Sequence, residues 1–208
     1  MSKLRFPAAV LAILILGVSA LMLQAADEKP GEGWISLFNG KDLTDWKASE
    51  GVQWTVENGE IVTPPNRSHL FTDQEFKNFE FKADCLTTPG SNSGLYFHTK
   101  YEDTFPKTGF EVQVNQTQGD PVKSGSLYNL IKLFSSPVKD NEWYTYHIIV
   151  KGQAITVKIN DKTLFEYVEP PGVEGPTNKL GKGSFAIQAH DPKSQARYKK
   201  IMVKPLPD

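Results

Sequence analysis

Residues 142–168, EWYTYHIIVKGQAITVKINDKTLFEYV, decide the fold class. Apolar side chains alternate with polar ones in three short runs, and residues 151–153 and 160–161 separate the runs. Alternation with a period of two is typical of β-strands, and Gly, Asn and Asp suit the tight turns between them. The stretch therefore predicts three consecutive antiparallel strands.

The same alternation recurs through most of the chain. Further predicted strands lie in WISLF (34–38), QWTVENGEIV (53–62), NFEFKADCL (78–86), SGLYFHT (93–99), FEVQVN (110–115), GSFAIQAH (183–190) and ARYKKIMVKPL (196–206). Asn58-Gly59 lies at the tip of a predicted hairpin. No segment longer than one helical turn shows a 3.6-residue apolar period. Many short strands with almost no helix predict an all-β fold, an antiparallel β-sandwich or jelly roll, in one domain.

Three segments resist this alternation and are expected to be loops. Residues 63–69 and 169–183 are rich in Pro and Gly, which interrupt strands. Residues 116–141 form a long excursion between two predicted strands. Long ordered loops in compact domains frequently carry functional residues.

The first 26 residues predict a targeting segment. Lys3 and Arg5 precede a mostly apolar run from 6 to 23, and the small residues Ala25 and Ala26 follow it. This order fits a signal peptide that is removed on export to the periplasm or the extracellular space. An uncleaved N-terminal membrane anchor is the alternative, because the run is long enough to cross a bilayer. Residues 27–208 are expected to form the single folded domain.

Charge and cysteine content narrow the function classes. The formal net charge is −1 at pH 7, so the chain has no positive field that would attract nucleic acid. Cys85 is the only cysteine, which excludes an internal disulfide. It alternates with Phe79, Phe81 and Ala83, and this pattern predicts a buried, unreactive thiol.

Three of the predicted strands carry an unusual polar face. Polar groups alternate with apolar ones at Tyr96 and His98, at Glu111, Gln113 and Asn115, and at Gln188 and His190. Solvated strand faces more often carry Lys, Thr and Glu. If the strands share a sheet, these side chains converge on one surface. Fixed donors and acceptors beside aromatic rings such as Trp54, Tyr96, Tyr128 and Trp143 suit a sugar.

A plain solvated sheet face is the bland alternative, because an isolated strand histidine is usually a satisfied core or surface residue. His98, Glu111 and His190 also have side chains that bind a divalent metal ion, although no short ligand spacing such as HExxH is present. The same three groups can act as acid and base without any metal. The sequence alone leaves these uses open.

The motifs together resemble the 3-keto-disaccharide hydrolase family. The resemblance rests on LFNGKDLTDWK (37–47), NSGLYFHT (92–99), the E-x-Q of Glu111 and Gln113, and the Q-x-H of Gln188 and His190. It covers about residues 33–206. It implies a concanavalin A-like jelly roll, and activity on glycosides whose glucose unit a separate oxidoreductase has first oxidised at C3.

The resemblance implies cleavage by removal of the C2 proton and elimination at C1, in some members with later hydration. The expected catalytic residues are Glu111 and His190. The expected substrate-binding residues are Asn92, His98, Gln113, Tyr128 and Gln188. His98 departs from the family pattern, since many relatives carry Arg or another residue there. A bound metal ion would stabilise the enolate, but no cofactor is required by the motifs.

Two other functions remain in competition. A non-catalytic carbohydrate-binding module would use the same fold. A conventional β-glucanase of this fold would carry two or three carboxylates on one strand, whereas this chain has only Glu111 before Gln113 and Asn115. The missing carboxylates favour keto-glycoside cleavage over conventional hydrolysis.

Overall fold

The computed structural model describes residues 31–208, and these fold into an antiparallel β-sandwich without helices, as the alternation predicts. The strands are β1 (Ile35–Ser36), β2 (Trp46–Ala48), β3 (Thr55–Glu57), β4 (Glu60–Val62), β5 (Ser68–Phe76), β6 (Phe79–Thr87), β7 (Asn92–Thr99), β8 (Phe110–Asn115), β9 (Tyr144–Lys151), β10 (Ala154–Ile159), β11 (Lys162–Val168), β12 (Gly183–Ala189) and β13 (Ala196–Pro205). Within these residues no helix is long and apolar enough to cross a membrane. The expected targeting segment, 1–26, lies outside the described residues.

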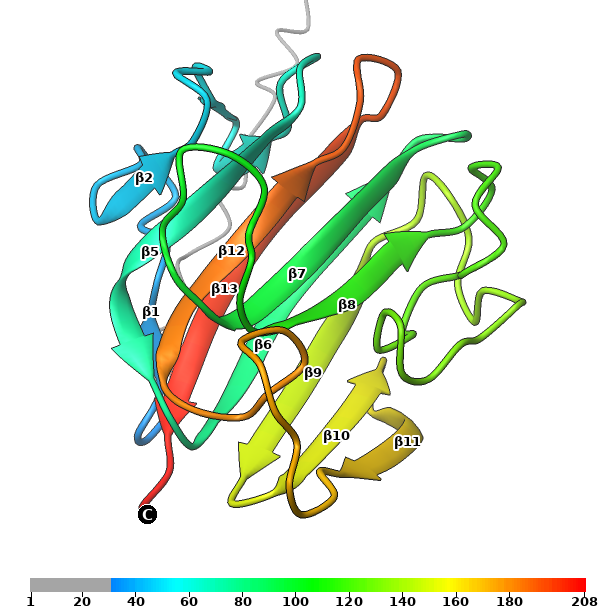
Figure 1. Ribbon diagram of the computed structural model, residues 1–208. Helices are drawn as coiled ribbons and strands as arrows, with labels where there is room; N and C mark the ends of the chain where they lie inside the picture. Colours follow the sequence, from blue (N-terminus) through cyan, green and yellow to red (C-terminus); the bar gives the residue numbers. More distant parts are fainter. Residues whose placement is uncertain (1–30) are drawn as a thin grey trace, which may run out of the picture.

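Two sheets form the sandwich (Figure 1). The larger sheet has the order β11-β10-β9-β6-β13-β4-β3, and β1 pairs with β13 beside it. The smaller sheet has the order β2-β5-β12-β7-β8. The three strands with the polar face, β7, β8 and β12, are neighbours in this smaller sheet. Their polar side chains can therefore converge on one surface.

The core lies between the sheets and is made by the apolar half of each alternation. Phe185 of β12 lies between two rings of β6, with centroid distances of 4.7 Å to Phe79 and 4.5 Å to Phe81. Phe97 and Phe110 stack at 5.1 Å within the smaller sheet. Each such buried ring stabilises the fold by roughly 1.5–3 kcal/mol. Because one face of β7, β8 and β12 is held in this core, their polar side chains must point outward.

Tyrosines of the larger sheet reach across the core to the main chain of the smaller one. The Tyr146 hydroxyl donates to the Gln113 carbonyl oxygen at 2.6 Å. The Tyr198 hydroxyl lies 2.6 Å from Ser93 Oγ, which in turn donates to the Gln188 carbonyl oxygen. These bonds fix β7, β8 and β12 from behind. Cys85 is buried and free among these tyrosines, and burial raises the pKa of its thiol to about 12, as expected for an unreactive group.

The turns follow the sequence, but β2 and β5 were not among the predicted strands. Asn58 and Gly59 have φ values of 53° and 80°, the left-handed pair expected for that hairpin. Residues 116–141 contain no named strand, as predicted. The prediction of a loop over 63–69 was wrong at its end, because β5 begins at Ser68. Pro64 and Pro65 interrupt pairing only before that point, so His69 lies on a strand.

Candidate active site

A pocket of about 290 Å³ lies on the outer face of the smaller sheet. Its walls are formed by Asn92, Phe105, Glu111, Gln113, Asp120, Tyr128, Gln188 and His190. Six of the seven residues expected from the sequence are therefore gathered around one cavity. An adjoining hollow of about 390 Å³ shares Phe105, Glu111 and Tyr128 with it, so the two form a continuous depression beside Glu111.

Glu111 is the carboxyl group at the centre of this depression. It lies on β8 directly opposite Tyr96 of β7. Burial raises the pKa of Glu111 to about 7, the hydrogen bond from Tyr96 opposes this rise, and the nearby charge of Asp120 adds to it. A carboxyl group with this pKa exchanges protons near neutral pH, so Glu111 is able to act as either a general acid or a general base.

Gln188 and Tyr96 hold the Glu111 carboxyl group. Gln188 Nε2 donates to the Tyr96 hydroxyl at 3.0 Å, and that hydroxyl donates to Glu111. Burial raises the pKa of Tyr96 well above its ordinary value, so the phenol keeps its proton. The amide oxygen of Gln188 is buried and has no hydrogen-bond partner. It is an acceptor available to a ligand.

His190 is a second titratable side chain of the pocket, and it contacts Asp191. His190 Nδ1 lies 2.8 Å from Asp191 Oδ2. Burial acts to raise the pKa of Asp191, but hydrogen bonds from Ser194, His190 and the Lys193 amide outweigh it and lower that pKa below its ordinary value. The ionised carboxylate accepts the Nδ1 proton and leaves Nε2 as a proton acceptor. This is the arrangement of a general base with an orienting carboxylate.

Asn92 and Gln113 form a buried amide pair on the pocket floor. Gln113 Nε2 donates to Asn92 Oδ1 at 2.9 Å. The Asn92 main-chain amide donates to Ser194 Oγ at 2.9 Å, and Ser194 Oγ donates to Asp191. The pair therefore connects β7 and β8 to the carboxylate that orients His190.

The long loop 116–141 supplies the rim. The Tyr128 amide donates to the Glu111 carbonyl oxygen at 2.9 Å, which holds Tyr128 beside β8 at the pocket wall. The Tyr128 hydroxyl lies 3.5 Å from Asp120 Oδ2. Asp120 was not expected from the sequence. The composition of the loop gave no signal for this particular residue, although the loop itself was expected to be functional.

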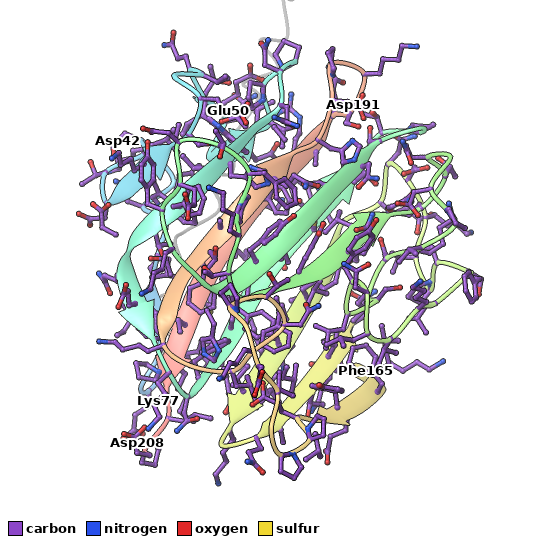
Figure 2. All side chains as sticks on the ribbon, viewed as in Figure 1. Asp42, Glu50, Lys77, Phe165, Asp191 and Asp208 are labelled. Carbon is purple, nitrogen blue, oxygen red and sulfur yellow. The ribbon has the colours of Figure 1, made fainter. Side chains whose placement is uncertain are left out.

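The convergence expected for His98 was wrong. His98 has a φ of 54°, which turns its ring away from the outer face and against Phe79 and Phe97. Its Nε2 donates to the Lys77 carbonyl oxygen at 2.8 Å and its Nδ1 accepts from the Gly181 amide at 3.2 Å. Lys77 and Asp191 are labelled at opposite ends of the smaller sheet in Figure 2, so the two histidines are far apart.

The candidate metal ligands do not form a site together. His98 is separated from Glu111 and His190, and residues 31–208 contain no group of three His, Cys, Asp or Glu side chains able to hold a metal ion. The observed side chains therefore do not fit the candidate metal ion.

Sequence reasoning also missed His69, Phe105 and the placement of two tryptophans. His69 lies on β5 opposite Gln188, and Phe105 lies edge-on to it from the loop after β7. Trp54 is in the core and donates to Ser68 Oγ. Trp143 packs under Lys199 on the other sheet. Only Tyr96 and Tyr128, of the four aromatic residues expected near a sugar, lie at the pocket.

The fold is a jelly-roll β-sandwich, shared with a protein provisionally assigned as a glycosyl hydrolase and with a protein of galectin-like fold. The sequence model of the 3-keto-α-glucoside-1,2-lyase-like domain matches residues 33–204, and the chain belongs to this family. It is similar to a 3-keto-disaccharide hydrolase of Bacteroides thetaiotaomicron, with 25% identity over 170 residues. The alignment covers 65% of this chain and 59% of that relative, so the chain spans only part of the relative's length.

Solved structures give the same fold. A Parabacteroides distasonis protein provisionally assigned as a glycosyl hydrolase aligns with a TM-score of 0.74 and 25% identity, over 85% of this chain and 95% of that one. A carbohydrate-binding module of Bacillus subtilis, CBM66, aligns with a TM-score of 0.57 and 14% identity, over 77% of this chain and 95% of that one. The second likeness concerns the fold alone.

Proposed function

We propose that this protein cleaves 3-keto-glycosides, with His190 as the base and Glu111 as the acid. One observation supports this most directly. Two groups suited to opposite proton transfers line one pocket: an imidazole whose Nε2 is open because Asp191 binds Nδ1, and a carboxyl group whose pKa is raised to about 7. Such a pair suits a reaction that needs a base and an acid at the same pH.

The ketone at C3 acidifies the neighbouring C2–H bond. His190 Nε2 takes the proton from C2. The electron pair of the broken C2–H bond forms a C2–C3 double bond, and the C3 oxygen becomes an enolate. The C3 carbonyl then re-forms, a C1–C2 double bond forms and the C1–O bond breaks. Protonated Glu111 gives its proton to the departing oxygen, so the products are an unsaturated keto sugar and an alcohol. Addition of water to the keto sugar would make the overall outcome a hydrolysis.

The amide groups of the pocket supply the remaining interactions. Gln113 and Asn92 present amide N–H groups beside their mutual bond, and these donors suit an oxygen that gains negative charge in the enolate. The free oxygen of Gln188 accepts from a sugar hydroxyl, and Tyr128 closes the rim. Fixed donors stabilise the developing charge without reorganisation, which is how such sites lower an enolisation barrier.

The proposed substrate implies a place in a reaction sequence and in the cell. A 3-keto-glycoside must be supplied by an oxidoreductase that acts on the C3 hydroxyl of a glycoside. Export is the proposed location, because Lys3, Arg5 and the apolar run after them have the order of a signal peptide. Soluble glycosides reach such a location directly.

Conventional glycoside hydrolysis is the second candidate, and Asp120 is the observation that favours it. Asp120 brings a second carboxylate to the pocket that holds Glu111. Its Oδ1 accepts from the Val122 amide at 2.8 Å, and its Oδ2 faces the Tyr128 hydroxyl. These bonds commit Asp120 to shaping its own loop, so we rank it below the pair of His190 and Glu111.

A product assay separates the candidates. The purified full chain is incubated with methyl 3-keto-α-D-glucopyranoside and with methyl α-D-glucopyranoside, each with and without a chelator, and methanol release is followed. Release from the keto substrate alone, unaffected by chelator, is expected. Release from the plain glucoside would favour hydrolysis by the carboxylates, and loss with chelator would contradict the metal-free assignment. No release from either, with sugar binding intact, would favour a binding module.

A further inference from the structure

We propose that the ring of His69 and the amide oxygen of Gln188 form a second sugar subsite, which Phe105 covers in this structure and which takes the leaving-group sugar of a disaccharide. The inference rests on the proposed function in taking a glucoside as the ligand. It deepens that function by naming the residues that would bind the leaving group.

The subsite is marked by buried polar atoms without partners. Within residues 31–208, only four buried side-chain nitrogen or oxygen atoms lack a hydrogen bond: both ring nitrogens of His69, the amide oxygen of Gln188, and one oxygen of Glu50. His69 and Gln188 are directly opposite each other on β5 and β12, so their side chains share the outer face. Three of the four atoms are therefore neighbours. Native proteins rarely leave such groups unpaired, and each cluster of them requires an explanation.

The surroundings of His69 give it no polar partner of its own. Its ring meets the rings of Tyr96 and Phe105 edge-on, each at a centroid distance of 5.3 Å. Burial, with a smaller contribution from the nearby charge of Arg67, lowers the pKa of His69 to about 3. The imidazole is therefore neutral, with one N–H donor and one nitrogen acceptor.

These groups match the chemistry of a sugar ring. A vicinal diol carries two hydroxyls, each of which donates and accepts, so it satisfies the donor and acceptor of His69 and the acceptor of Gln188 together. The aromatic face of Phe105 offers an apolar surface for the C–H groups of a pyranose. Gln188 also lines the pocket that holds His190. A ring bound here would therefore adjoin the bond that the proposed reaction breaks.

The cover over the subsite is weakly attached. In the part of the chain that the structure describes, residues 100–108 make no main-chain to main-chain hydrogen bond outside the strands. The segment is held at its ends, where Lys47 Nζ lies 3.5 Å from the Tyr101 ring centroid and Thr177 donates to the Lys107 carbonyl oxygen. Figure 1 shows this green loop in front of β5 and β12. Between its anchors Phe105 is 44% exposed, and displacing its apolar side chain breaks no side-chain hydrogen bond.

Equilibrium binding to the full chain tests the subsite. The probes are trehalose and maltose, which carry a second sugar ring, and methyl α-D-glucopyranoside, which does not. His69→Phe keeps a ring of similar size but removes both nitrogens. His147→Phe is the matched control, because His147 lies on the larger sheet and contacts Glu80. Ring proton signals of His69 in the wild-type chain give a second readout that does not depend on any variant folding.

We expect the wild-type chain to bind at least one disaccharide more tightly than the methyl glucoside. His69→Phe should weaken that disaccharide by about tenfold, the value of one or two lost hydrogen bonds, and leave the methyl glucoside unchanged. His147→Phe should change neither, and His69 signals should shift with disaccharide only. Equal weakening of both probes by His69→Phe, unshifted His69 signals, or no disaccharide advantage would overturn the subsite. Turnover of methyl 3-keto-glucoside does not need the subsite, so it tests the proposed function separately.

Discussion

Glu111 occupies the space that a side chain on Gly94 would fill. A Cβ on Gly94 would lie 2.5 Å from Glu111 Oε1 and 3.0 Å from its Cγ. Gly94 and Tyr96 alternate along β7, opposite Gln113 and Glu111 of β8, so the missing side chain lets the carboxyl group lie across the sheet toward Tyr96. The glycine is thus a positioning element for the proposed acid.

The substitution Gly94→Ala tests this relationship. The added methyl group must displace the Glu111 carboxyl group, and a displacement of about 1 Å lowers turnover by up to a hundredfold. We expect kcat for a 3-keto-glucoside to fall, with the melting temperature changed by only a few degrees. Gly119→Ala is the control, since a Cβ there meets nothing within 4 Å. Equal activity of the two variants would show that Glu111 is not placed by Gly94.

Glu111→Gln should remove both activity and a pH dependence of stability. Because the folded pKa of about 7 exceeds the ordinary value of 4.5, the folded chain binds the extra proton between these values. The stability that this bound proton contributes is fully present below pH 4.5 and is lost as the pH rises through 7. The free energy of unfolding therefore falls by at most about 3 kcal/mol over this range. Urea unfolding at pH 5 and pH 8 should therefore show a smaller difference for the variant than for the wild-type chain.

The activity of the wild-type chain should fall on the alkaline side as Glu111 loses its proton. Initial rates across pH 5 to 9 with a 3-keto-glucoside would show this decline. A rate that is unchanged well above pH 7 would assign the proton for the leaving group to another residue.

Asp191→Asn should separate orientation from folding. The asparagine keeps the shape of the side chain but loses the charge that fixes the Nδ1 proton of His190, so we expect kcat to fall by about a hundredfold or more. Circular dichroism and melting should stay close to the wild-type values. Asp73→Asn, on an exposed position of β5, is the control and should keep full activity. If the Asp191→Asn variant is as active as this control, Asp191 does not orient the base.

His98→Asn should lower stability and leave activity unchanged. Asparagine tolerates the positive φ of this position, but it cannot bridge the Lys77 carbonyl oxygen and the Gly181 amide. Leaving these groups unpaired should lower the free energy of unfolding by about 1–3 kcal/mol. KM and kcat measured below the melting transition should stay unchanged. A large rise in KM with intact stability would restore His98 to the substrate site.

The sequence predicts the parts of the site that lie on alternating strand positions. Glu111 and Gln113 must share a face because they are two residues apart, and the same holds for Gln188 and His190. Once the strands are neighbours, five side chains gather without further information, namely Asn92, Glu111, Gln113, Gln188 and His190. Tyr128 reaches the pocket from loop 116–141. The core side of each strand was equally predictable, since Phe79, Phe81 and Cys85 follow the same period.

The sequence failed where the backbone leaves that period. His98 has a positive φ that no sequence motif indicates. At this position the strands approach closely, since a Cβ on Gly109 would lie 2.2 Å from the Phe97 oxygen. His69 was missed because Pro64 and Pro65 made its segment look like a loop. Asp120 and Phe105 reach the pocket from loops, and the course of a loop depends on tertiary contacts rather than on local pattern.

The tyrosines that cross the core have a consequence for how this site can evolve. Tyr146 and Tyr198 anchor β8, β7 and β12 through main-chain carbonyl oxygens and Ser93, not through the side chains that face the pocket. The scaffold is therefore indifferent to which residues stand at positions such as Gln113 and Gln188. Substitutions at those positions can therefore alter the pocket while the framework that holds the strands stays intact.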